Sequence, residues 1–325
     1  MKTSTGILGL TLAAVVGGPA MAQDNLTIAY INKLEDAPWF VAEVAGARAE
    51  AEALGITLAH QGVQTDSNKA ISALDTNIAA GVDGVIIVVP DQSIGPAILE
   101  RTVAAGIPVI AVDDGIMDAA GNPAPFVGFE AVLIGQQVGN AIADFHGELG
   151  WGNMAAEGTY ILSIEVQGLS VCMDRTDNAN AILAERLGLS EDRVIHIPYD
   201  PGTLDRAIAA TSQTLVAIPQ ALRFLVHACN DEGVTGAVRA LEQAGIGADD
   251  TIGVGIGGQL ACEEFKKDEV TGFRGTIYVD SAIHGQTAVR LMHAFLTEGT
   301  EIPARTIVDG ILITKADTRG VAECQ

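Results

Sequence analysis

Short runs of β-branched and other apolar residues alternate with longer amphipathic segments from Leu26 to Leu296. Runs such as Val85–Val89 are apolar at every position, which is typical of parallel strands that helices cover on both faces. The strand-like runs are Leu26–Ile31, Ile56–His60, Gly84–Val89, Pro108–Asp113, Thr159–Glu165, Val194–Ile197, Arg223–Ala228, Thr251–Ile256 and Gly272–Val279. The helical segments, with apolar residues three and four apart, are Pro38–Leu54, Asn68–Ala80, Ile94–Ala105, Arg175–Leu187, Thr203–Ala217, Val234–Ala244 and Ala282–Leu296. This alternation predicts a doubly wound α/β protein.

A weak internal repeat predicts that the chain forms two similar lobes. Asp91 and Asp231 each open a helical segment, as N-cap residues do, and both segments run into Ala-Gly-Ile before the next strand. A length of 325 residues also favours about two domains. Ligands of open α/β sheets bind beyond the carboxyl ends of the strands, so two facing lobes predict a binding cleft between them.

The charge balance excludes several classes of partner. The chain has 18 Lys+Arg against 41 Asp+Glu, which gives a formal net charge of −23. So few basic residues cannot neutralise the phosphates of a nucleic acid or an anionic membrane surface, and we expect neither as a partner. The hydrophobic content of 48% is spread along the chain, which argues against disorder.

The first 22 residues have the features of a secretory signal peptide in their usual order. Met1-Lys2 gives a basic start, Gly6–Gly18 is apolar, and Ala20-Met21-Ala22 has the form that signal peptidases cleave. The apolar run is too short to span a membrane, which takes about 20 residues. We therefore expect cleavage after Ala22 and a soluble mature protein outside the cytoplasm; a buried N-terminal helix is the alternative.

The four cysteines leave two interpretations open. Cys172, Cys229, Cys262 and Cys324 are too few to form a disulfide framework in a chain of this size, and their spacing matches no metal motif. Either one pair is oxidised, with Cys262 and Cys324 as the first choice because Cys324 lies on an untethered tail, or all four are buried or free thiols.

Motifs for cofactor and metal chemistry are absent or misleading. Gly253–Gly258 matches the G-x-G-x-x-G dinucleotide pattern, but its glycines occupy a strand instead of following one, and too little chain remains for a dinucleotide fold. The sequence contains no G-x-S-x-G and no H-E-x-x-H, and its six histidines lack ligand spacing. We expect no cofactor, no metal ion and no catalytic residue.

Polar residues follow several of the strand-like runs. Asp113 and Asp114 stand where one apolar strand stops, Asn230 follows another, and Lys33 follows the first. Helix capping explains some residues of this kind. Together, however, they offer carboxylates, a carboxamide and an ammonium group, the mixture that a neutral polyhydroxyl ligand needs because each hydroxyl both donates and accepts.

An aromatic pair stands next to these polar residues. Trp39-Phe40 begins the first long helical segment and can supply the flat apolar wall on which sugar C–H faces pack. Filling of the core is the alternative role for Trp39. The pair strengthens the prediction of a sugar site.

Several short segments follow one another in a recognisable order: Ala37–Phe40, Ile110–Asp114, Asn230-Asp231 with Gly236–Ala240, Ile252–Ile256, Thr271–Phe273 and Ile311–Thr314. In this order they resemble the type I periplasmic sugar-binding proteins of ABC importers, in particular their arabinose-binding members. The resemblance covers essentially the whole mature chain.

The resemblance implies a set of sugar contacts. They are the lysine Lys33, the stacking Trp39 with Phe40 beside it, the paired aspartates Asp113 and Asp114, the arginine Arg175 and the cleft asparagine Asn230. Charged groups of this kind make strong hydrogen bonds to neutral hydroxyls once water is excluded.

The chain departs from the arabinose-binding pattern at several of these positions, which implies a related but different sugar. The departures are Ala37 in place of a glutamate, with Asp36 beside it; Val171 in place of a threonine; Phe129 in place of a methionine that tunes sugar choice; and Gly257 in place of an asparagine, with Gln259 nearby. An arabinose- or galactose-like monosaccharide is the expected ligand.

The family further implies two discontinuous lobes joined by a three-segment hinge. One lobe would hold residues 24–130 and 280–308, and the other residues 131–279 and 309–325. The sugar would favour closure, and a permease in the inner membrane would recognise the closed monomer in the periplasm. The alternatives are a sensor for a chemoreceptor or histidine kinase and an exported sugar-modifying enzyme; the export signal argues against a repressor of the same fold.

Overall fold

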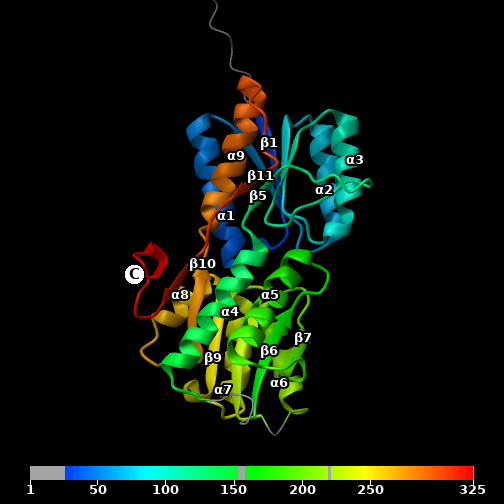
Figure 1. The fold of residues 1–325 in the computed structure, drawn as a ribbon. Helices are drawn as coiled ribbons and strands as arrows, with labels where there is room; N and C mark the ends of the chain where they lie inside the picture. Colours follow the sequence, from blue (N-terminus) through cyan, green and yellow to red (C-terminus); the bar gives the residue numbers. More distant parts are fainter. Residues whose placement is uncertain (1–25, 153–157, 219–220, 325) are drawn as a thin grey trace, which may run out of the picture.

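The computed structural model describes residues 26–152, 158–218 and 221–324 of the chain, which form two stacked lobes (Figure 1). The predicted signal peptide and its cleavage site lie outside these residues. Each lobe contains one six-stranded sheet with helices on both faces. The predicted fold class, two doubly wound α/β lobes, is confirmed.

The first sheet has the strand order β11-β5-β4-β3-β1-β2, and all of its neighbouring strands are parallel. Its strands are β1 (Thr27–Asn32), β2 (Thr57–Gly62), β3 (Gly84–Ile87), β4 (Val109–Val112), β5 (Phe126–Gly128) and β11 (Arg305–Ile307). The helices of this lobe are α1 (Pro38–Leu54), α2 (Ser67–Ala80), the 3-10 helix η1 (Gln92–Ile94), α3 (Gly95–Ala105) and α9 (Ser281–Glu298). α1 and α9 cover one face of the sheet, and α2 and α3 cover the other (Figure 1).

The second sheet has the order β12-β10-β9-β8-β6-β7, and it is parallel except for β12, which runs antiparallel to β10. Its strands are β6 (Thr159–Glu165), β7 (Val194–Pro198), β8 (Arg223–Ala228), β9 (Thr251–Gly257), β10 (Phe273–Tyr278) and β12 (Ile311–Thr314). The helices are α4 (Ala131–Glu148), α5 (Ser170–Leu187), η3 (Glu191–Arg193), α6 (Leu204–Leu215), α7 (Asp231–Gln243), η4 (Ala248–Asp250), α8 (Gln259–Phe265) and η5 (Ala322–Cys324). The order β7-β6-β8-β9-β10 repeats the order β2-β1-β3-β4-β5 of the first sheet, so the two lobes share one topology, as the internal repeat predicted.

The apolar strands build a core on each face of each sheet. In β1, Ile28 and Tyr30 point toward α1 and α9, while Ala29 and Ile31 point toward α2 and α3, and all four are fully buried. Both faces of a covered parallel sheet are dry, which is why such strands are apolar at every position. The second sheet repeats the arrangement, with α4 and α5 on one face and α6 and α7 on the other.

The chain passes between the two sheets three times within the described residues. The crossings follow β5, β10 and β11, at Phe129–Glu130, Val279–Asp280 and Val308–Gly310. They lie together at the waist of the molecule, where the two lobes meet (Figure 1). Each lobe is therefore assembled from segments that are distant in sequence.

Some elements escaped the sequence prediction. The strands β5, β11 and β12 and the helices α4 and α8 were not expected. The G-x-G-x-x-G segment behaves as predicted: Gly253 and Gly255 lie inside β9, and Gly258 precedes α8. No helix among the described residues is both long and apolar enough to cross a bilayer.

The predicted helix cap at Asp231 is wrong. Asn230 caps α7, because its side-chain oxygen accepts the backbone N–H of Gly233. Asp231 is buried inside the lobe, where its carboxylate accepts the backbone N–H of Gly258 at 2.7 Å and the hydroxyl of Thr276 at 2.7 Å. The role predicted for Asp91 is confirmed, since its carboxylate accepts the Ser93 N–H at the start of η1.

All four cysteines form disulfides. Cys262 in α8 is bonded to Cys324 in η5, which is the expected pair, and it ties the C-terminal segment to the second lobe. Cys172 in α5 is bonded to Cys229, which follows β8. The alternative of four thiols is therefore wrong, and the second disulfide was not predicted.

Candidate ligand-binding site

A cavity of about 320 Å³ lies between the two lobes. This volume is at the lower end of the range for small-molecule sites, which begins near 300 Å³. All eleven residues selected from the sequence line it: Lys33, Asp36, Trp39, Phe40, Asp113, Asp114, Phe129, Arg175, Asn230, Gly257 and Gln259.

The topology explains why these residues meet. In the first lobe, Lys33 follows β1, Asp113 and Asp114 follow β4, and Phe129 follows β5, so all four lie at the carboxyl edge of one parallel sheet. This edge is where open α/β sheets bind ligands. Pro38 occupies the first position of α1, and Trp39 follows it in the first turn beside the same edge.

The second lobe places its own sheet edge opposite. Asn230 lies between β8 and α7, Gly257 ends β9, and Gln259 begins α8. Arg175 projects from the second turn of α5, the helix that follows β6. Two carboxyl edges thus face one cavity.

Asp113 is the most constrained residue of the cavity. Its carboxylate accepts the indole N–H of Trp39 at 2.5 Å and lies 2.6 Å from Nδ1 of His284. Burial alone would raise its pKa, but the hydrogen bonds from His284, Glu43 and Trp39 stabilise the charged form and lower the pKa to about 2. Its φ of 61° lies in the left-handed region, which aspartate adopts more readily than most non-glycine residues.

A second buried acid, Glu43, lies near Asp113. Glu43, in α1, is fully buried and accepts the Tyr30 hydroxyl at 2.5 Å. Burial and the nearby charge of Asp113 raise the pKa of Glu43 well above its usual value. These effects favour the neutral form of Glu43, which reduces the repulsion between the two carboxyl groups.

Glu43, Asp113 and His284 also form the one group among the described residues whose donor atoms, within 4.8 Å of one another, could hold a metal ion. Hydrogen bonding already uses Nδ1 of His284 and both carboxylate oxygens of Asp113. The raised pKa of Glu43 favours its neutral form and so lowers the negative charge of this cluster.

Asp114 has a different partner. It forms an ion pair with Lys33, and both side chains are largely buried, at 2% and 12% exposure. Burial raises the pKa of Asp114, while the Lys33 ammonium opposes the shift. The ammonium also lies 5.7 Å from the centre of the Phe40 ring. Lys33 and Asp114 together offer a donor and an acceptor to the cavity.

Arg175 brings a positive charge from the second lobe. Its guanidinium donates from Nη1 to the backbone oxygen of Cys229 at 2.6 Å and lies 4.3 Å from the centre of the Phe129 ring. Burial lowers its pKa, and the charges of Asp114 and Asp113 oppose that shift. Its buried Nε has no hydrogen-bond partner among the described residues. A buried donor without an acceptor costs about 1–3 kcal/mol.

The side chain of Asn230 makes its hydrogen bonds within its own lobe. Its side-chain oxygen accepts from the Tyr199 hydroxyl at 2.6 Å and from the Gly233 N–H at 3.0 Å, and its Nδ2 donates to the Gly202 oxygen at 3.1 Å. An amide nitrogen has two hydrogens, so one donor remains for the cavity.

Gly257 and Gln259 border the cavity from β9 and α8. Gly257 has a φ of 126°, which side chains other than glycine rarely adopt. A Cβ built there would lie 3.6 Å from Cε3 of Trp39, so the two lobes approach closely at this point. Gln259 donates from Nε2 to the Ser281 hydroxyl of the other lobe at 3.3 Å.

A model of the periplasmic binding protein domain family matches residues 28–301. The chain belongs to this family. It is 35% identical over 309 residues to an ABC transporter L-arabinose-binding periplasmic protein of Azospirillum brasilense, covering 94% of this chain and 91% of that one. It is 30% identical to the L-arabinose-binding periplasmic protein of Escherichia coli, covering 97% and 95%.

Solved structures agree on the fold. A solute-binding protein of an ABC transporter from Mycobacterium smegmatis, with bound glycerol, superimposes with a TM-score of 0.78 at 24% identity, over 91% of this chain and 96% of that one. The binding protein of an arabinose ABC transporter from Shewanella, bound to L-arabinofuranose, gives 0.74 at 20% identity, over 90% and 93%. Membership of the family implies a periplasmic location, and the family is one of solute-binding proteins rather than enzymes.

The cavity residues that the sequence analysis missed in this periplasmic binding protein include Cys172, Cys229 and Glu232. Burial, followed by the charge of Asp231, raises the pKa of Glu232 to about 7. The sequence could have indicated Glu232, because it directly follows Asn230-Asp231 and lies in the first turn of α7. The cysteines gave no such signal, since only the fold joins them.

Direct hydrogen bonds also link the two lobes of this periplasmic binding protein. Oε1 of Gln92, in η1, accepts both the backbone N–H and the hydroxyl of Ser170 at the start of α5, each at 2.8 Å. Its Nε2 donates to the Gly115 oxygen at 2.6 Å, which fixes the amide orientation. Together with the bond between Gln259 and Ser281, this contact joins the lobes beside the cavity.

Proposed function

We propose that this protein is the substrate-binding component of an ABC importer and binds an arabinose- or galactose-like monosaccharide between its lobes. The single observation that carries the proposal is the cavity itself. Carboxylates from one sheet edge and the guanidinium of Arg175 from the other line the same cavity of about 320 Å³.

The chemistry of the cavity suits a neutral polyhydroxyl ligand. Asp113, Asp114 and Lys33 offer charged acceptors and a donor, and Arg175 offers further donors. Hydrogen bonds that involve one charged partner are about twice as strong as neutral ones, and they strengthen where water is excluded. Phe129, packed under the Arg175 guanidinium, supplies an apolar face for sugar C–H groups.

The proposed working cycle depends on the three crossings between the sheets. We propose a first lobe of residues 24–130 and 280–308, a second lobe of residues 131–279 and 309–325, and a hinge at the crossings. The sugar would favour closure because only the closed state offers groups from both lobes. The closed monomer would then be recognised by the permease in the inner membrane. Cleavage after Ala22 would release the mature protein into the periplasm.

A thermal-shift screen of the purified protein against pentoses, hexoses and sugar alcohols tests the proposal. A ligand that binds only the native state raises the melting temperature, so we expect a rise with a small set of monosaccharides. Calorimetry on each hit should give one site per chain. A protein that responds to no monosaccharide, or one that converts a labelled sugar into a product, would contradict the proposed role.

A matched variant separates binding in the cavity from binding elsewhere. Arg175→Met removes the guanidinium while keeping a long side chain against Phe129. We expect this variant to fold and to lose the sugar-induced shift. An unchanged shift would place the ligand outside this cavity.

A further inference from the structure

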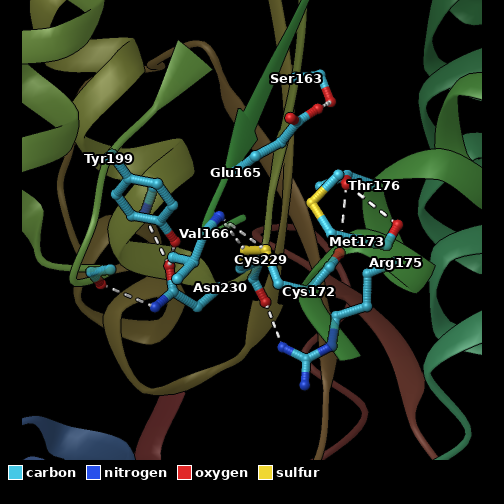
Figure 2. Close-up of a disulfide and its surroundings, with 12 residues drawn as sticks. Ser163, Glu165, Val166, Cys172, Met173, Arg175, Thr176, Tyr199, Cys229 and Asn230 are labelled. Atoms are coloured by element: carbon cyan, nitrogen blue, oxygen red, sulfur yellow. Dashed lines mark hydrogen bonds between the residues drawn. A yellow bond between two sulfur atoms is a disulfide. The ribbon is translucent and has the colours of Figure 1, made fainter. Parts of the chain in front are cut away.

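The disulfide between Cys172 and Cys229 lies in the wall of the cavity. Cys172 is the third residue of α5, and Cys229 immediately follows β8 (Figure 2). Both residues line the cavity, with exposures of 1% and 5%. The bond therefore joins two segments of the second lobe that are 57 residues apart in sequence but share one edge of the site.

The disulfide also fastens a third segment. The backbone N–H of Val166, the first residue after β6, donates to Sγ of Cys172 at 3.0 Å and to Sγ of Cys229 at 3.3 Å. Figure 2 shows both bonds converging on the sulfur pair. The ends of β6 and β8 and the first turn of α5 are thus held at one point.

The position of Arg175 depends on the segments that the Cys172–Cys229 disulfide joins. Arg175 lies one turn after Cys172 on α5, and its Nη1 donates to the backbone oxygen of Cys229 at 2.6 Å (Figure 2). The residues on both sides of this contact are therefore covalently connected through the disulfide. Asn230, the next residue after Cys229, accepts a hydrogen bond from the Tyr199 hydroxyl at 2.6 Å.

The second disulfide provides a contrast within the same lobe. Cys262 and Cys324 are 62 residues apart and join α8 to η5, and neither is among the described residues that line the cavity. Loops of nearly equal length should stabilise the fold against unfolding by similar amounts. The two disulfides differ, however, in that only the Cys172–Cys229 bond joins segments that line the cavity.

We propose that the Cys172–Cys229 disulfide is a positioning element of the ligand site, which fixes Arg175 and the β8 edge for binding. The proposal rests on the proposed function, because it assumes that a sugar binds in this cavity. Preorganised donors bind more tightly because the ligand does not have to order them. Sugar affinity should therefore depend on this bond and not on the other one.

Two double variants test the proposal. Cys172→Ala with Cys229→Ala removes the bond at the cavity, and Cys262→Ala with Cys324→Ala is the matched control. We expect both to lower the melting temperature by similar amounts. Calorimetry with the sugar that binds the wild type should show at least a ten-fold weaker Kd for the first variant and a change of less than two-fold for the control.

A variant with two serines is more conservative than the alanine variant, and it tests the covalent bond separately from the polar atoms. Cys172→Ser with Cys229→Ser keeps polar atoms near the Val166 N–H but no bond between the segments. We expect the same ten-fold loss of affinity. Wild-type affinity in this pair, or equal losses in the cavity and control variants, would overturn the positioning role. A wild-type protein that binds no monosaccharide would instead refute the proposed function.

Discussion

His227 allows a quantitative prediction about pH and stability. It lies in β8, is 1% exposed, and has its Nε2 2.8 Å from Oδ1 of Asn180. The Asn180 amide donates to the Ser163 hydroxyl at 3.2 Å, so its oxygen is the acceptor for His227 and Nε2 of His227 carries a proton. Nδ1 of His227 is buried without a partner among the described residues. Burial, with a smaller effect of His196, lowers its pKa to about 3.

The sign and size of the effect follow from this shift. An unfolded histidine takes up a proton near pH 6.5, whereas folded His227 stays neutral until about pH 3. Between these values the unfolded state binds more protons, so stability falls as the pH falls. Each pH unit is equivalent to about 1.36 kcal/mol, which predicts a loss of ~2 kcal/mol by pH 5 and a limit of ~5 kcal/mol near pH 3.

Urea unfolding of the wild type and of His227→Gln at pH 7, 6 and 5 measures the effect. Glutamine keeps a donor for Asn180 but does not titrate, so the variant should lose ~2 kcal/mol less than the wild type between pH 7 and 5. His196→Gln is a control of opposite sign. The hydrogen bond and charge of Glu165 outweigh partial burial and raise the pKa of His196, so His196 adds stability on the acid side. Parallel pH profiles for the wild type and His227→Gln would refute the reasoning.

Three further predictions concern the cavity. Asp113→Ala leaves buried donors unpaired and should weaken sugar binding at least thirty-fold, from a loss of about 2 kcal/mol or more; calorimetry giving near-wild-type affinity would remove Asp113 from the site. Gln92→Ala removes hydrogen bonds between the lobes and should weaken binding about five-fold, while small-angle scattering shows a more open ligand-free protein; an unchanged radius of gyration would contradict this. Gly257→Asn forces a side chain onto a φ of 126° and should cost about 1–3 kcal/mol of stability, whereas Gly247→Asn, at a φ of −90° in open space, should be nearly neutral; equal unfolding midpoints would argue against strain.

The main elements of the fold were predictable because their pattern is local. Strands such as β6 and β8 match the predicted runs residue for residue, since an apolar run between turn signals reports burial directly. The edge strands β11 and β12, of three and four residues, were missed because their pairing partners come from distant parts of the chain. Such short segments carry too few positions for a periodic pattern.

Helix α4 was missed for a different reason. Its glycines weaken the local helix signal, yet packing requires them. A Cβ on Gly135 would lie 2.2 Å from the backbone oxygen of Arg175, so α4 and α5 can approach this closely only without a side chain there. Tertiary contact therefore outweighs local propensity in the helix pair that carries Arg175.

The cavity residues were predictable to the extent that they follow strands. Asp113 and Lys33 could be placed from strand ends alone, because parallel strands deliver their carboxyl ends to one edge. The groups behind them could not be placed. His284 contacts Asp113 from 171 residues away, and Glu43 reaches it from α1, so neither neighbour leaves a trace in the local sequence.

The hydrogen bonds that Ser170 donates to Gln92 have a consequence for the transport role proposed above. Because these bonds use only groups of the protein, in the proposed cycle they favour closure by about 1 kcal/mol in all, whether or not a sugar is bound. They tighten apparent affinity by raising the fraction of molecules that are already competent to bind. The same contribution reduces the difference in closure between sugar-loaded and empty molecules that a transporter could sense. A stronger contact would therefore lead more empty molecules to dock at the transporter. In the proposed cycle, the strength of this contact between η1 and α5 therefore determines how closely closure of the lobes depends on a bound sugar.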